Sequence, residues 1–186
     1  MVDVIGSQRR PYDSEQLAAG WQSMSRLAAL VQRGGHPAAV RPTVALLHGE
    51  KQYASFLADV RVFHTARVDL SHRIGGVFLD GGSGPDGWTD EGRAAVVVTD
   101  RRLLVRDTEY EFRSLIKLQP NPIDFSLTLY FQGCAPMELT GPWVPWTTVV
   151  LCAEMFGSPW PPGHVPLPDV RLPAQRRRRR RALTAG

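Results

Sequence analysis

Cysteine is scarce in this chain: only Cys134 and Cys152 occur among 186 residues. Two thiols without a Cys-x-x-Cys spacing supply neither a tetrahedral zinc site nor a disulfide framework of the kind that staples small secreted domains. Cys134 lies near the end of an expected strand and Cys152 in an expected apolar helix. We therefore predict that both cysteines are buried and reduced, as in a cytoplasmic protein.

Long hydrophobic runs are also missing. No window approaches the roughly 20 apolar residues that a membrane-spanning helix needs. Arg9-Arg10 near the start is not followed by the apolar stretch of a secretory signal. Because 43% of the residues are nevertheless hydrophobic, as in ordinary globular proteins, we expect a folded, soluble protein in the cytoplasm.

Catalytic signatures are missing as well. The sequence has no Gly-x-Ser-x-Gly elbow, no Walker-type phosphate loop and no His-Glu-x-x-His motif. Asp69 and His72 form the only pair that resembles an acid–base or metal pair, and it lacks a nucleophile or third ligand at a motif spacing. We therefore predict a non-enzymatic protein with no catalytic residues, no metal and no cofactor.

Lysine is rare, with Lys51 and Lys117 as the only examples, so the cationic residues are almost all arginine. The net charge is +4, and six arginines form one run, so the rest of the chain carries +4 − 6 = −2. A nucleic-acid-binding face spread over the fold is therefore disfavoured. The candidate anion-binding residues are those of the run: Arg176, Arg177, Arg178, Arg179, Arg180 and Arg181.

Three interpretations of this polyarginine run remain open. At an anionic membrane each cation contributes about 1 kcal/mol, so the run would attach the protein peripherally. On DNA, about six neutralised phosphates would give a log–log salt dependence with a slope near −5. Alternatively, the run is a disordered, solubilising end with no ligand.

An amphipathic helix is expected over residues 14–33. Asp13-Ser14 offers an N-cap, apolar residues follow at helical spacing, and Gly34-Gly35 ends the pattern. The Trp21/Met24 stripe on this helix is expected to pack on the chain's own fold. Pro42 suggests a second, short helix over residues 43–48.

Strands are expected to dominate the middle of the chain. Apolar residues alternate with polar ones over 54–62 and 123–131, while 94–105 consists of two Val- and Leu-rich runs around the polar step Thr99–Arg102. Shorter strands are marked by Tyr110, Phe112, Ile116 and Leu118, and by Met137 and Leu139. The glycine-rich stretch 81–92 is interpreted as a mobile surface loop.

One helix is expected to follow the strands. Trp146, Val149, Val150, Ala153 and Phe156 fall on one side of it, and Gly157 ends it. Residues 158–175 contain six prolines and are expected to form an extended linker. The predicted organisation is an N-terminal extension (1–42), one domain (43–157) and a disordered linker with the polyarginine tail (158–186).

Two short motifs carry a resemblance to a known family. Gly49-Glu50 precedes the first strand, and Val96–Val105, reading V-V-V-T-D-R-R-L-L-V, forms the central hairpin. With the strand–glycine–helix unit that ends the domain, these motifs resemble bacterial pleckstrin-homology-like (PH-like) and GRAM-like domains. The resemblance implies an α+β, mainly β fold: a strongly bent antiparallel sandwich or barrel of about seven strands, capped by a C-terminal helix.

The resemblance implies binding rather than catalysis, because this fold hosts modules for lipids, peptides and proteins. The segment His64–Ile74 matches the loop that binds lipid headgroups in some PH domains, but it lacks their dense basic pattern. Arg101 and Arg102 are expected to extend into water or to pair with Glu109 and Glu111. The expected partner is thus an unknown protein, bound at an edge strand or at a groove beside the helix.

Overall fold

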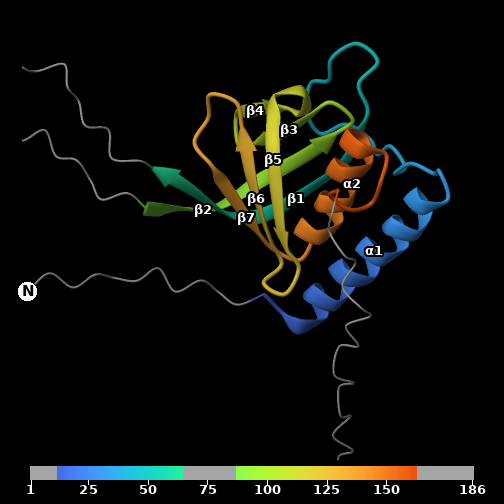
Figure 1. The fold of residues 1–186 in the computed structure, drawn as a ribbon, viewed down its shortest axis with the longest axis horizontal. Helices are drawn as coiled ribbons and strands as arrows, with labels where there is room; N and C mark the ends of the chain where they lie inside the picture. The colour runs from blue at the N-terminus through green and yellow to red at the C-terminus, as the bar shows by residue number, and fades with distance from the viewer. Residues whose placement is uncertain (1–11, 65–86, 163–186) are drawn as a thin grey trace, which may run out of the picture.

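The structure of the protein, a computed structural model, describes residues 12–64 and 87–162 (Figure 1). The elements in chain order are α1 (Ser14–Gln32), β1 (Gln52–His64), β2 (Gly87–Thr99), β3 (Arg102–Val105), β4 (Thr108–Glu111), a 3₁₀ turn (Phe112–Ser114), β5 (Leu115–Asn121), β6 (Ser126–Phe131), β7 (Met137–Thr140) and α2 (Val144–Phe156). The predicted α+β, mainly β architecture is confirmed.

The seven strands form one antiparallel sheet in the order β4-β3-β2-β1-β7-β6-β5. The sheet curls so strongly that β5, β6 and β7 cross in front of β1 and β2 in Figure 1. Among the described residues it does not close into a ring, and β4 and β5 are its two edges. The predicted 94–105 hairpin is present as β2 and β3, with Val97 opposite Leu104.

Alternating strand side chains fill the inner face of the sheet. In β6, Leu127, Leu129 and Phe131 are buried while the residues between them are not. This period of two confirms the predicted pattern for β6 and places the apolar side of this strand in the core, where it contacts α2. The hydrophobic core is continuous from these strands into α2.

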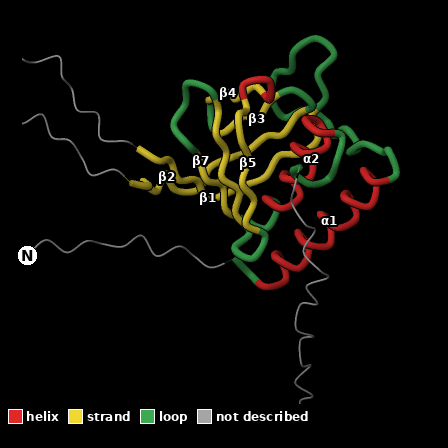
Figure 2. The backbone as a smooth tube through the Cα atoms, viewed as in Figure 1, coloured by secondary structure: helices red, strands yellow, loops and turns green. Residues whose placement is uncertain are grey.

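The last helix, α2, lies between the sheet and α1 (Figure 2). Pro145 stands in its first turn, and Gly157 caps its end as predicted. Six consecutive residues from Thr147 to Cys152 are buried, so the helix is enclosed on both sides. An enclosed helix of this kind is apolar all round rather than amphipathic.

The first helix, α1, forms the outer layer; the predicted range 14–33 is confirmed to within one residue, since the helix ends at Gln32 and Arg33 caps it. The Asp13 carboxylate accepts a hydrogen bond from the Glu15 amide at 3.0 Å, which satisfies a free N–H of the first turn. Met24 belongs to the core, and Trp21 meets Phe125 edge-to-face at 6.1 Å. The Trp21/Met24 stripe therefore packs on the chain's own fold.

Gly20 allows α1 to approach the segment before α2 closely. A Cβ atom at this position would lie 1.9 Å from the carbonyl oxygen of Pro142. Because that neighbour is backbone, it cannot move aside as a flexible side chain could. The helix therefore depends on a residue without a side chain at this contact.

Three of the predicted secondary-structure segments differ from the structure. Residues 43–48 form no helix; this segment instead supplies bonds to the sheet, such as the Thr43 amide to Gln52 Oε1 at 2.8 Å. Residues 87–92 belong to β2 rather than to a loop, because they pair with β1. The register of this pairing shifts between Val60 and Arg61. The strand expected from Ile123 begins at Ser126, since Phe125 has a φ of 52° in the preceding turn.

The folded body extends past Gly157. Pro159 is buried, and the partly buried Trp160 packs against the core. The remainder of the predicted linker and tail from 163 onward, like residues 65–86, lies outside the described residues. Within the described part of the chain, neither helix is long and apolar enough to cross a bilayer.

Replacing Gly20 with Ala is expected to destabilise the protein by about 1–3 kcal/mol, because the new methyl group overpacks a rigid contact. Helix propensity alone predicts the opposite sign, a gain of about 1 kcal/mol. Urea unfolding of Gly20→Ala measures the change, with Gln22→Ala, at an exposed position of the same helix, as the control. Equal or greater stability of Gly20→Ala would contradict the close α1 contact.

Candidate functional site

The two motifs that carried the family resemblance meet at one end of the sheet. Gly49-Glu50 precedes β1, and Thr99–Arg102 joins β2 to β3. Because β1 and β2 run antiparallel, the start of one lies beside the end of the other, with Gln52 opposite Thr99. Residues about 50 positions apart in the sequence thus become neighbours.

Thr99 and Asp100 shape the turn between β2 and β3. The Thr99 hydroxyl accepts hydrogen bonds from the amides of Arg101 at 3.1 Å and Arg102 at 2.9 Å. Asp100 Oδ1 accepts the Lys51 amide at 3.0 Å and thereby joins the turn to the start of β1. Hydroxyl and carboxylate groups of this kind commonly bond nearby backbone amides in turns.

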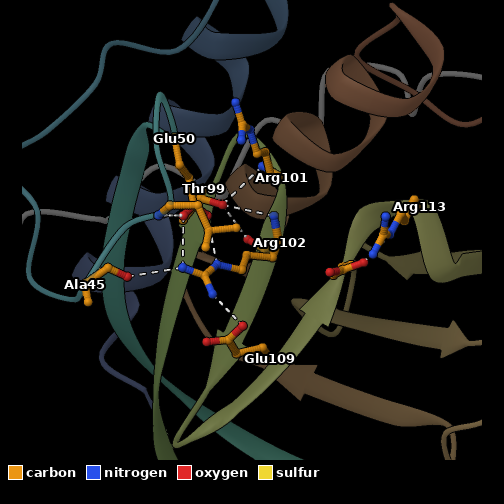
Figure 3. Close-up of polar contacts among 9 residues, drawn as sticks. Ala45, Glu50, Thr99, Arg101, Arg102, Glu109 and Arg113 are labelled. Carbon is orange, nitrogen blue, oxygen red and sulfur yellow. Dashed lines mark hydrogen bonds and ion pairs between the residues drawn. The ribbon is translucent and has the colours of Figure 1, made fainter.

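Arg102 forms a buried ion pair with Glu50 (Figure 3). Its Nε and Nη2 atoms donate to the two Glu50 carboxylate oxygens at 2.8 and 2.9 Å. The side chains are only 5% and 0% exposed, respectively. Nη2 also donates to the Ala45 carbonyl at 3.1 Å, and Nη1 pairs with Glu109. The guanidinium is therefore held on several sides.

The sequence prediction for the arginine pair is correct in part. Arg102 pairs with Glu109, which was one of the two expected alternatives. Its main partner, Glu50, was not predicted. Glu111 pairs with Arg113 instead of with the turn arginines. Arg101 follows the other alternative and is exposed, so the two adjacent arginines have different environments.

Glu50 is held as a carboxylate. Burial raises its pKa, but the hydrogen bonds from Arg102 and from the Leu47 amide outweigh that effect, and the net pKa of Glu50 is lowered. Glu50 therefore remains ionised below the pH at which an ordinary carboxyl group takes up a proton.

A pocket of about 450 Å³ lies beside this network. It is lined by the loop after α1, the start of β1, the β2–β3 turn and α2. Its polar side chains are those of His36, Lys51, Tyr53, Asp100, Arg101 and Glu154. Its size is within the range of small-molecule sites.

Gly49 lies beside Arg101 at the pocket. Its φ of 75° is in the left-handed region that favours glycine. A Cβ atom there would lie 3.5 Å from Nη2 of Arg101, which is ordinary van der Waals contact. In Gly49-Glu50, the glycine therefore permits the backbone turn and the glutamate pairs with Arg102.

A hydrogen bond between Tyr53 and Glu154 joins β1 to α2 at the pocket. The Tyr53 hydroxyl donates to Glu154 Oε1 at 3.0 Å. Burial, and then the Glu154 carboxylate, raise the pKa of Tyr53 well above that of free tyrosine. The phenol therefore stays protonated as a donor, and it orients the carboxylate.

The sheet edge at β5 is a second candidate site. β5 pairs with β6 on one side and with no strand on the other side within the described chain. A register shift between Leu115 and Lys117 leaves Ile116 as an extra residue, 71% exposed, and Pro120 follows later in the strand. The opposite edge, β4, is four residues long and carries Glu109 and Glu111.

Most of the candidate residues chosen from the sequence fall elsewhere. Arg176–Arg181, Asp69 and His72 lie outside the described residues. His64, at the end of β1, lies 4.0 Å from Glu91. No group of three His, Cys, Asp or Glu side chains that could hold a metal occurs in the part of the chain that the structure describes.

The cysteine prediction is correct for one residue only. Cys152 is buried in α2, and burial raises the pKa of its thiol to about 12. Cys134 is exposed, because it follows β6 in a turn rather than lying on the buried face. Neither is in a disulfide.

The pocket residues Lys51, Tyr53 and Glu154 were not predicted from the sequence. Two signals were present: Lys51 directly follows Gly49-Glu50, and Glu154 is the only charged residue in α2. Their proximity could not be read from the sequence, because it depends on how α2 packs over the start of β1.

Comparison with known proteins adds no relative: no family model, no curated protein and no solved structure matches this chain.

Glu50→Ala is expected to lower the free energy of unfolding at pH 7 by about 3 kcal/mol, because it leaves Arg102 buried without its main partner. The pKa of Glu50 is lower in the folded than in the unfolded protein. The contribution of Glu50 to the free energy of unfolding is therefore fully present above the unfolded-state pKa, and it is lost as the pH falls through the folded-state pKa. Denaturant unfolding at a series of pH values should show the difference between wild type and Glu50→Ala shrinking in acid.

Glu111→Gln is the matched control, because Glu111 belongs to an exposed pair with Arg113, worth less than about 1 kcal/mol. If Glu50→Ala changed stability no more than this control, the buried pair would not be a principal support of the fold.

Proposed function

We propose that this chain is a non-catalytic, PH-like binding module whose ligand is another protein. The curled seven-strand sheet and the helix that follows it are compatible with a PH-like barrel. The fold alone does not specify a ligand, since similar folds carry many functions. The open β5 edge is the observation on which the choice of a protein partner rests.

The β5 edge is better suited to a partner strand than the β4 edge. An extended segment can add to an exposed edge through main-chain hydrogen bonds, with side-chain contacts giving selectivity. Ile116 offers an exposed apolar contact at β5, whereas the short β4 strand carries two carboxylates, a feature that discourages edge pairing. A cytoplasmic location would suit such a role.

The Ile116→Asp variant is expected to abolish capture of the partner, because it puts a charge on the apolar contact of the edge. Affinity capture from a native lysate, followed by mass spectrometry, compares this variant with wild type. Ile123→Asp is the matched control: Ile123 is 78% exposed in the turn that joins β5 to β6, beyond the last residue of the β5 edge.

A specific partner should be retained by wild type and Ile123→Asp and lost by Ile116→Asp. It should also be retained when Arg176–Arg181 are replaced by serine. Capture of the same proteins by all variants, or of none by wild type, would contradict binding at β5.

The six consecutive arginines support a second candidate function, electrostatic attachment to an anionic membrane or nucleic acid. Guanidinium groups bind phosphates bidentately. Because phosphate groups occur in both nucleic acids and anionic lipids, this attachment would need no particular nucleotide sequence or lipid headgroup. It would act together with, and not instead of, a protein site on the folded body.

Replacing Arg176–Arg181 by serine is expected to remove this attachment. Co-sedimentation with anionic vesicles and with DNA, repeated at several salt concentrations, compares the two proteins. For DNA, the wild type should show a log–log slope near −5, from about six neutralised phosphates, and the variant a much smaller one. Equal binding by both proteins would rule the tail out.

A further inference from the structure

The charged groups that line the 450 Å³ pocket balance one another. Lys51 and Arg101 carry positive charge, and Asp100 and Glu154 carry negative charge, so the four groups sum to zero. A multiply charged anion such as phosphate would be repelled by the two carboxylates while it met the two cations. A ligand that carries one charge of each sign suits this lining better.

The two cations are available to a ligand. Lys51 Nζ and the Arg101 guanidinium have no ion-pair partner among residues 12–64 and 87–162. The backbone that carries them is fixed by hydrogen bonds: the Lys51 amide donates to Asp100, and the Arg101 amide donates to Thr99. The two side chains themselves are exposed, so a ligand would order them on binding.

The carboxylates on the other side are fixed as well. Tyr53 donates to one oxygen of Glu154, and the Lys51 amide donates to one oxygen of Asp100. Both donors are uncharged, so neither carboxylate is neutralised by these bonds. An ammonium group would therefore meet two carboxylates whose hydrogen bonds in this network come from uncharged donors, within the same pocket as the cations.

From this arrangement we infer that the pocket binds a small zwitterion of the amino-acid class. The ligand carboxylate contacts Arg101 and Lys51, with the guanidinium able to bind it bidentately, and the ligand ammonium contacts Glu154 and Asp100. This site is distinct from the proposed protein contact at β5, because the two share no lining residue.

A series of ω-amino acids tests the inference on the full chain. Glycine, β-alanine, γ-aminobutyrate and ε-aminocaproate differ in the distance between ammonium and carboxylate, so the pocket should prefer one member. Two-dimensional amide NMR titration measures affinity and location together. Saturable shifts are expected at Lys51, Tyr53 and Arg101 with the preferred zwitterion.

Single-charge analogues and inorganic phosphate supply the contrast. Butylammonium, butyrate and phosphate should each bind at least about tenfold more weakly than the preferred zwitterion, because each leaves charges of one sign uncompensated. Comparable binding of butyrate or phosphate, or no saturable binding of any zwitterion, would overturn the inference.

Two variants locate the contacts. Arg101→Gln and Glu154→Gln should each weaken binding by about tenfold or more. Arg113→Gln, which removes an exposed arginine elsewhere, should leave it unchanged. Thermal melting checks that each variant is folded, and unchanged affinity in a folded Arg101→Gln protein would also overturn the inference. A failure here would leave the β5 proposal standing, since that proposal is tested by Ile116→Asp.

Discussion

The pairing of Glu50 with Arg102 is the interaction on which this end of the molecule depends. The carboxylate comes from the segment before β1 and the guanidinium from the first residue of β3, so the bond spans the strand between them. Two buried opposite charges satisfy each other only in one arrangement, which fixes where β1 starts relative to the β2–β3 turn. Thr99 and Asp100 stabilise the same region: Thr99 accepts the Arg102 amide within the turn, and Asp100 accepts the Lys51 amide at the start of β1.

This arrangement separates two adjacent arginines into two roles. Arg102 faces the interior and supports the fold, while Arg101 lies over Gly49 at the edge of a pocket. The same rigid turn therefore stabilises the sheet and positions a free cation. A residue pair that looks uniform in sequence is divided because Arg101 lies in the turn, whereas Arg102 is the first residue of β3.

The sequence predicted the regular elements well where a single periodicity decided them. The β6 alternation and the Asp13-capped helix are local patterns, and both are present. Residues 87–92 were misread because glycine-rich composition is typical of loops, yet cross-strand bonding to β1 holds them extended. Here a tertiary contact overrode local preference.

The candidate site was far less predictable. Glu50 and Arg102 are 52 positions apart, and Tyr53 and Glu154 are 101 apart, so neither contact leaves a local pattern. The motifs around Gly49 and Thr99 identified important residues without indicating that they touch. Such pairings depend on strand register and helix packing, which are properties of the whole fold.

The irregular β5 edge limits what can attach to it. An extra residue at Ile116 twists the strand, and Pro120 has no amide hydrogen to donate. A long, flat segment, including β5 of a second copy, cannot align along its whole length. The edge geometry therefore disfavours fibre-like stacking of identical molecules but leaves room for a short strand from a partner. The same two irregularities would thus oppose aggregation and favour short binding segments.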